Sequence, residues 1–144
     1  MKTGLFRTAS TLAAVVFIVA GNFALEFFHQ TRTTALARTL VTDITRSLLG
    51  SADSTPLLAL ADDDLKLAAP DLTPLERFGE LIALEPPKGN IFVPPLFSAV
   101  TGNASLQLRA SFAYGIADVS VELEYREGSW HLRQYVLTPG RGVM

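Results

Sequence analysis

The chain begins with a long apolar stretch that carries no charged side chain. Residues 8–25 contain no Asp, Glu, Lys or Arg, and residues 12–20 are the most apolar part of this stretch. A helix of this length would measure about 27 Å, which is just enough to cross the hydrocarbon core of a thin bilayer. The pattern therefore predicts a transmembrane helix in residues 1–28, followed by a folded domain in residues 29–144.

The charges around this stretch predict its orientation. Lys2 and Arg7 precede it, and positively charged residues stay on the cytoplasmic side of a membrane helix. We therefore expect residues 8–25 to contact the lipid bilayer of a bacterial-type inner membrane, with the N-terminus in the cytoplasm and the domain in the periplasm. Two alternatives stay open. One is a signal peptide cleaved near residues 19–21, which would release a secreted periplasmic protein, and the other is an ordinary buried helix.

Residues 30–49 show the periodicity of an amphipathic helix. Apolar residues recur every four positions and charged residues fall between them. The predicted stripe consists of Leu36, Leu40, Ile44 and Leu48, and it is broadened by Val41 and Leu49. The helical pattern is unbroken from residue 26 onward, so the N-terminal segment is expected to run directly into this helix. Gly50 and Ser51 then predict its C-terminal end.

Shorter elements are predicted between this helix and the last third of the chain. Ser54 stands two residues before Pro56, and Thr73 stands directly before Pro74, as helix-capping residues do. They predict short helices at 56–68 and 74–80. A strand is expected at 81–84.

Residues 88–100 combine turn and strand signals. Lys88, Gly89 and Asn90 predict a turn. Residues 91–100 are β-like, but Pro94 and Pro95 within them cannot donate hydrogen bonds to a neighbouring strand. This segment is therefore expected to be an edge strand or a broken strand.

The last third of the chain alternates between apolar and polar residues. Three strands are predicted within residues 104–138, joined by tight turns at Tyr114-Gly115 and Glu127-Gly128. On the third strand, Trp130, Leu132, Gln134 and Val136 are expected to share one face. The pattern predicts an antiparallel three-strand meander with one or two further strands.

The fold class that follows is α+β. An N-terminal transmembrane helix precedes helices that pack on one face of a curved antiparallel sheet. The amphipathic helix at 30–49 is the expected cover for the apolar face of that sheet.

Composition removes several classes of function. The chain has no cysteine, which excludes disulfides, thiolate metal sites, a catalytic thiol and a lipidated cysteine. Its 12 basic and 14 acidic residues give a net charge of -2. Because nucleic-acid-binding domains carry a basic surface, no nucleic-acid partner is predicted.

The elements of the domain resemble those of a known group of small exported domains. The similarity is carried by residues 75–89, 104–113 and 119–123 and by Gly128-Ser129-Trp130. In these segments the chain is similar to NTF2-like and cystatin-like α+β domains, which include families of unknown function and membrane-tethered assembly factors for cytochrome oxidase. The resemblance implies a fold and a tethered topology. It implies no catalytic residue, because no acid and tyrosine pair matches the pocket of the enzymatic members.

No residue set predicts a metal site, a cofactor site or a catalytic centre. His29 and His131 are isolated from acidic residues in register. Residues 62–64 are three consecutive aspartates, without the alternating ligands, the glycine and the final glutamate of a calcium-binding loop. The chain also lacks the glycine motifs that bind phosphates and the Gly-x-Ser-x-Gly motif of hydrolases. We therefore predict no catalytic, cofactor-binding or metal-binding residue.

A small-ligand-binding or enzymatic pocket stays open as an alternative. In an NTF2-like pocket, a buried acid beside a tyrosine can transfer a proton, and the available groups are Asp118, Tyr114, Tyr125 and Tyr135. Asp118 falls in the polar register of its strand, which favours a solvated position. A deep cavity lined by tyrosine with an inward Asp or His would support this alternative.

The leading hypothesis is a non-enzymatic function in protein binding. The apolar segment around the paired prolines is the predicted contact surface, and it consists of Phe92, Pro94, Pro95, Leu96 and Phe97. An equally open interpretation is that these residues cap the open end of the sheet. Under the leading hypothesis, the chain is a single-pass membrane-anchored domain that binds a membrane protein partner or assists its assembly.

Overall fold

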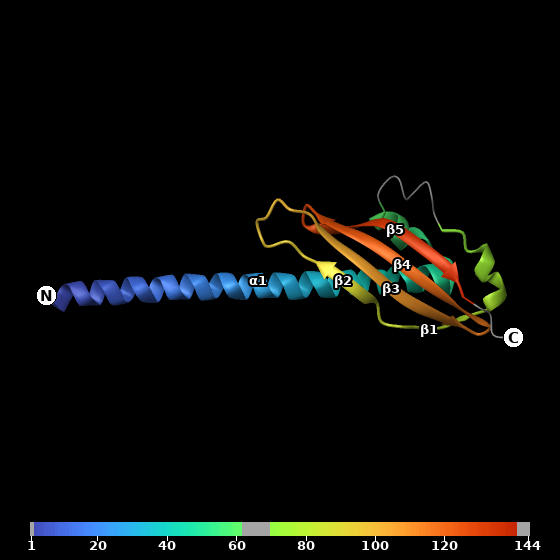
Figure 1. Cartoon of the computed structure of the whole chain (residues 1–144), viewed down its shortest axis with the longest axis horizontal. Helices are drawn as coiled ribbons and strands as arrows, with labels where there is room; N and C mark the ends of the chain where they lie inside the picture. The colour runs from blue at the N-terminus through green and yellow to red at the C-terminus, as the bar shows by residue number, and fades with distance from the viewer. Residues whose placement is uncertain (1, 62–69, 141–144) are drawn as a thin grey trace.

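The computed structural model describes residues 2–61 and 70–140, with side chains from residue 15 onward. One long helix, α1 (Lys2–Ser51), lies along one face of a five-stranded antiparallel sheet (Figure 1). The strands are β1 (Leu81–Leu84), β2 (Lys88–Phe92), β3 (Gly102–Phe112), β4 (Gly115–Arg126) and β5 (Ser129–Pro139). Two short helices, α2 (Thr55–Leu60) and the 3-10 helix η1 (Thr73–Phe78), lie between α1 and the sheet in sequence.

The strands follow the order β1-β3-β4-β5, and β2 pairs with the same strand, β3, as β1 does. The meander of β3, β4 and β5 is therefore the main part of the sheet, as the alternating pattern predicted. The predicted turn at 88–90 is wrong, because these residues begin β2 and pair with β3. Gly89 permits this pairing, since a Cβ atom at its position would lie 1.9 Å from the Ser105 carbonyl oxygen.

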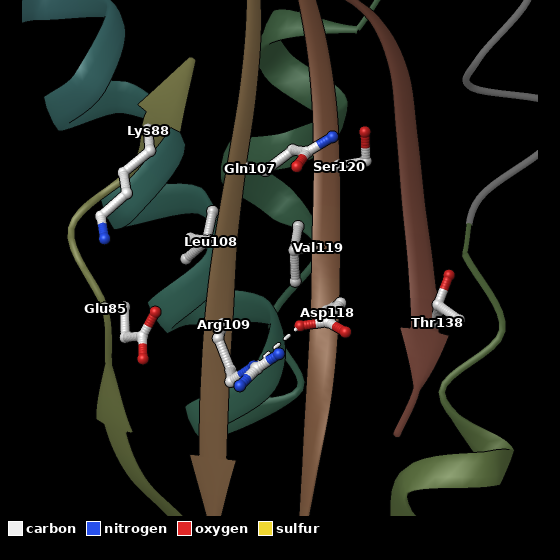
Figure 2. Close-up of a pocket in the computed structure, with 9 residues that line it drawn as sticks. All are labelled: Glu85, Lys88, Gln107, Leu108, Arg109, Asp118, Val119, Ser120 and Thr138. Carbon is white, nitrogen blue, oxygen red and sulfur yellow. Dashed lines mark hydrogen bonds and ion pairs between the residues drawn. The ribbon is translucent and has the colours of Figure 1, made fainter. Parts of the chain in front are cut away.

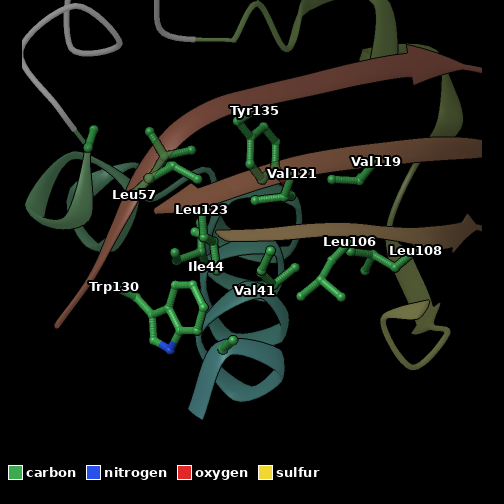
Figure 3. Close-up of a cluster of buried hydrophobic side chains, with 14 of the residues drawn as sticks. Val41, Ile44, Leu57, Leu106, Leu108, Val119, Val121, Leu123, Trp130 and Tyr135 are labelled. Atoms are coloured by element: carbon green, nitrogen blue, oxygen red, sulfur yellow. The ribbon is translucent and has the colours of Figure 1, made fainter. Parts of the chain in front are cut away.

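The C-terminal half of α1 provides one side of the hydrophobic core. Ala37, Val41, Ile44 and Leu48 are buried against the sheet, which is the spacing of one helix face. The predicted stripe was therefore partly wrong, because Leu36 is exposed. Facing these residues are the inward side chains of the meander (Figure 3), among them Leu106, Val119, Val121, Leu123 and Trp130.

The N-terminal half of α1 projects beyond the sheet as a continuous rod (Figure 1). Within the parts of the chain that the structure describes, no helix is both long enough and apolar enough to cross a membrane. The predicted transmembrane helix, and the inner-membrane location with a periplasmic domain that rested on it, are therefore wrong. From residue 15 onward, where side chains are described, the uncharged apolar run covers only residues 15–25 before Glu26, and this length is too short to cross a bilayer.

The helix α1 ends later than the sequence indicated. Gly50 lies inside the helix, and the left-handed residue after it is Ala52, with φ of 54°. The backbone N–H of Asp53 donates to the Ser47 carbonyl oxygen at 3.0 Å. The chain reverses here without a glycine at the left-handed position, which costs free energy because an L side chain crowds its own backbone in this conformation.

Ser54 occupies the N-cap position of α2 as predicted, but its side chain forms no capping hydrogen bond, and Leu72 rather than Thr73 occupies that position of η1. An aspartate just before each helix is the acceptor instead. Asp53 Oδ1 accepts a hydrogen bond from the Thr55 N–H, and Asp71 Oδ1 accepts one from the Thr73 N–H, both at 3.0 Å. Asp71 also accepts a hydrogen bond from the Thr73 hydroxyl, and this bond is the main cause that lowers the pKa of Asp71. The bond from the Thr55 N–H likewise lowers the pKa of Asp53. The predicted helix at 56–68 ends at residue 60 in α2, and residues 62–69 lie outside the described part of the chain.

A second, smaller core cluster closes the far end of the sheet. Leu75 and Phe78 of η1 pack against Ala110, Phe112 and Ala117. Gly115, which opens β4, lies directly under the Phe78 ring, so that a Cβ atom there would be 2.6 Å from a ring carbon. The glycine is therefore required by close packing.

The outermost strand contains an irregularity that the alternating pattern did not reveal. Leu132 pairs with Leu123 and Gln134 pairs with Glu122, so Arg133 is an extra residue on β5. Such a β-bulge moves every later side chain to the opposite face. Tyr135 is consequently buried and Val136 is exposed. The predicted shared face of Trp130, Leu132, Gln134 and Val136 is therefore wrong from residue 134 onward.

Candidate interaction site

The loop between β2 and β3, residues 93–101, lies against α1 where that helix leaves the sheet (Figure 1). Gln30 Nε2 donates to the Val93 carbonyl oxygen at 3.0 Å. His29 Nε2 lies 3.2 Å from the Pro94 carbonyl oxygen, which can only accept, so this ring nitrogen is the donor. The Leu96 backbone N–H donates to Glu26 Oε2 at 3.0 Å. One turn of α1 thus binds three consecutive parts of the loop.

Glu26 is the charged member of this contact. Its other carboxylate oxygen, Oε1, accepts a hydrogen bond from Gln30 Nε2 at 3.0 Å. The bonds from the Gln30 side chain and the Leu96 backbone hold the pKa of Glu26 below its usual value. The carboxylate is therefore ionised at neutral pH, and its charge strengthens both hydrogen bonds.

Aromatic side chains support the loop from the sheet side. The rings of His29, Tyr125 and Trp130 form a column, with centroid separations of 6.1 Å and 5.1 Å and edge-to-face geometry. The indole N–H of Trp130 donates to the Thr33 carbonyl oxygen at 3.0 Å. These contacts connect α1, β4 and β5 beneath the loop, so the loop rests on a rigid base.

The structure divides the five predicted contact residues into two groups. Pro94 is buried and Leu96 is half-buried, so they serve the end of the sheet. Pro95 is exposed, Phe92 is 48% exposed, and Phe97 is completely exposed. Pro94 and Leu96 fit the interpretation that this segment caps the sheet, whereas the contact surface stays a prediction, and Phe97 is the residue that the fold does not use.

Phe97 also has an unusual backbone. Its φ is 64°, in the left-handed region that non-glycine residues rarely adopt. Holding a bulky residue there costs about 1 kcal/mol or more. The neighbouring hydrogen bonds from α1 fix the loop in this conformation, and they present the ring to solvent.

A small hollow lies beside Phe97. Its volume is about 240 Å³, and its walls include Pro94, Pro95, Tyr125 and Gly128. Small-molecule sites usually measure roughly 300–1,000 Å³. The hollow is therefore better matched to one inserted side chain than to a whole ligand.

A second exposed apolar group lies on α1 itself, within and just after the apolar stretch at residues 8–25. From residue 15 onward, its projecting part exposes four phenylalanines to 64–83%, and these are Phe17, Phe23, Phe27 and Phe28. The signal that indicates this surface is the placement of Glu26 and Gln30 on the buried face of the helix. These polar residues lie on the same helix face as the buried apolar residues further along α1. They mark the point at which the sheet no longer covers that face.

A different hollow, of about 490 Å³, lies on the outer face of the sheet (Figure 2). Arg109 Nε donates to Asp118 Oδ1 at 3.0 Å across β3 and β4, and this contact raises the pKa of Arg109. Both side chains are about half exposed. Glu85 and Lys88 border the same hollow (Figure 2). This surface is open and charge-balanced, as is usual for the solvated face of an antiparallel sheet.

The four groups of the enzymatic alternative lie in different places. Asp118 belongs to the outer face, whereas Tyr135 points into the core and its hydroxyl donates to Thr45 Oγ1 at 3.0 Å. Burial raises the pKa of Tyr135 to about 12. Tyr114 is exposed at the β3–β4 turn, and Tyr125 belongs to the aromatic column. The fold does not bring an acid and a tyrosine together from this set.

The histidines and aspartates considered for metal binding are also accounted for. His29 holds the loop, and His131 Nε2 lies 3.1 Å from Ser129 Oγ. Among the described residues, no group of three or more potential metal-ligating side chains occurs. Asp62, Asp63 and Asp64 lie outside those residues.

Comparison with known proteins gives no match. Neither family models, nor curated proteins, nor solved structures are significantly similar to this chain. The resemblance to NTF2-like and cystatin-like domains therefore stays a prediction.

Proposed function

We propose that this chain is a non-enzymatic binding module that docks onto a partner protein through the apolar end of the domain. The observation that carries the proposal is Phe97. Its ring is completely exposed, its backbone is in the left-handed region, and its loop is fastened to α1 by Glu26, His29 and Gln30.

The energetics of Phe97 support binding over folding. Full burial of such a side chain contributes about 1.5–3 kcal/mol. In the free chain none of this stabilisation is obtained, while the backbone strain is still present. Exposed apolar residues on a rigid support are typical of binding surfaces, where a partner supplies the missing contacts.

The partner in this proposal is a protein with an apolar surface. The hollow beside Phe97 suits one inserted side chain, and Phe92, the last residue of β2, adds an exposed apolar ring directly before this loop. The expectations that the partner is a membrane protein and that residues 8–25 contact a bilayer are not tested by these observations, and both stay predictions.

Co-purification of full-length variants tests this function. Phe97→Ser and Phe92→Ser should reduce recovery of the partner at least about tenfold, because a buried anchor residue contributes more than 1.4 kcal/mol to binding. Tyr114→Ser is the matched control, since Tyr114 is also an exposed aromatic residue but lies at the opposite end of β3 and β4. It should bind like the wild type.

Phe97→Gly separates binding from folding. Glycine adopts positive φ without crowding, so this variant should keep or raise the free energy of unfolding, by up to about 1 kcal/mol. Partner recovery should nevertheless fall as it does for Phe97→Ser. If the wild type recovers no specific partner, or if Phe97→Gly binds normally, the proposed function is wrong.

A further inference from the structure

Between residues 15 and 28, α1 exposes apolar side chains on every side of the helix. At about 100° per residue, Phe17 and Phe28 lie on the opposite side from Val19. Phe27 lies about 80° from Val19 in one direction, and Leu25 lies about 120° from it in the other. All five side chains are 51–83% exposed.

A single polar side chain, which is exposed, interrupts this surface. Between residues 15 and 25, Asn22 is the one residue with a polar side chain, and the nearest charged group that follows is Glu26. Glu26 is engaged by Gln30 and by the loop. The apolar circumference therefore begins where the domain's own contacts with α1 end.

The exposed area is large enough for a stable interface. With roughly 200 Å² for each aromatic side chain, the four phenylalanines, at 64–83% exposure, together expose about 600 Å². A standard interface buries about 800 Å² on each partner. The neighbouring aliphatic residues, which include Val15, Val16 and Ile18 at 51–63% exposure, add to the aromatic area.

One partner helix cannot cover this surface. A helix packed against a neighbour buries a stripe about 100° wide, whereas a helix that is apolar all round is normally enclosed. A symmetric bundle of copies of this chain would also leave part of the apolar surface uncovered, because each helix of such a bundle keeps an outward face in solvent. Contacts from several sides require more than one element of a different protein.

We propose that residues 15–25 of α1 insert between helices of the partner protein, which contacts them from all sides and also contacts the exposed Phe27 and Phe28 at their border with the loop. This inference rests on the proposed function and adds the form of the partner's site. The loop at 93–101 then borders the entrance to that site, with Phe97 at its rim. Insertion stops at this border because Glu26 and Gln30 are already bound to the loop.

Photo-cross-linking from four sides of the helix tests the insertion. A photoreactive amino acid replaces Phe17, Val19, Leu25 or Phe27, one position in each full-length variant, and the cells are irradiated. All four variants should give a cross-linked product with the same heterologous chain. The control position is Arg38, which is exposed on the same helix within the domain, and it should give no such product.

A second measurement uses the absence of cysteine in the natural chain. Single cysteines at the same four positions should react with a hydrophilic maleimide in the isolated chain. In the purified complex they should all react at least about tenfold more slowly. Cysteine at Arg38 should react equally in both.

Each other outcome overturns the insertion. Cross-links or protection at only one or two adjacent positions would mean docking on one face, and the proposed function would survive if Phe97→Ser still lost the partner. Products with twice the mass of the chain would identify a second copy as the occupant. If irradiation gives no protein product, or only lipid adducts, the partner has no helical site around α1.

Discussion

The residues at the end of α1 show how a single position can carry strain without function. Ala52 has φ of 54°, while Gly50 occupies an ordinary helical position two residues earlier. Glycine is favoured in the first conformation and costs about 1 kcal/mol relative to alanine in the second. The two residues therefore stand in the less favourable order.

Exchange of these two residues should stabilise the fold. Ala52→Gly relieves the left-handed strain, and Gly50→Ala improves the helix, since a Cβ atom there meets only Leu81 Cδ2 at 3.6 Å. Each variant should raise the free energy of unfolding by about 0.5–1 kcal/mol, and the double variant by about the sum. Chemical denaturation measures this. A loss of stability in Gly50→Ala would show that Gly50 is needed at the helix end after all.

At this scale the sequence was informative about residue types but not about their roles. It marked the start of the two short helices, yet the acceptors are Asp53 and Asp71 instead of Ser54 and Thr73. Aspartate, serine and threonine all accept hydrogen bonds at helix starts, so composition alone does not assign the bond. Likewise, the paired prolines identified the segment around residues 92–97 from its composition. They did not show that Phe97 is the one residue of the five predicted contact residues that is fully exposed.

The elements depend on a few close contacts between strands and helices. Gly115→Ala would place a methyl group 2.6 Å from the ring of Phe78, so η1 must move away from the sheet. We expect a loss of about 1–3 kcal/mol in the free energy of unfolding. Phe78→Leu in the same chain should recover part of this loss by making room. An unchanged stability for Gly115→Ala would show that η1 adjusts freely.

Alternation predicted the three long strands because each strand has one buried and one solvated face. It failed after Arg133, where the β-bulge reverses the faces of β5. Val136 is as apolar as Leu132, so the reversal has no signature in hydrophobicity. The strand β2 was predicted only in residues 91 and 92, at its C-terminal end, since Gly89 and Asn90 are turn residues that here pair with Leu106 and Ser105.

For the whole molecule, the stability of the core should depend on pH at the alkaline end. Tyr135 is buried, and its pKa is raised to about 12 from an ordinary value of 10.0. Above pH 10.0 the unfolded chain releases this proton while the folded chain keeps it, so stability falls with rising pH until about pH 12. Thermal unfolding should show a loss of up to about 3 kcal/mol across this interval.

Two variants check this assignment. Tyr135→Phe should remove the alkaline dependence, and it should cost about 1–2 kcal/mol at neutral pH because Thr45 loses its partner. Thr45→Val combined with Tyr135→Phe should restore part of that loss. If Tyr135→Phe keeps the full alkaline slope, another group is responsible.

The packing of one helix on one sheet was predictable from the sequence. The prediction for the N-terminal segment was wrong. An apolar run of limited length has the same composition whether it crosses a bilayer or lies in a protein interior. Glu26, His29 and Gln30 acquire their roles only when the loop at 93–101 lies against them, and that contact joins positions more than sixty residues apart.

The continuity of α1 has a consequence for the amount of this protein in a cell. The same unbroken helix, without proline from residue 2 to residue 51, forms both the projecting rod and one wall of the core. A partner that holds the rod therefore also holds the fold, and ligands that bind only the folded state shift its unfolding equilibrium. Chains without a partner should be degraded faster, so the steady-state level of this protein should follow the level of its partner.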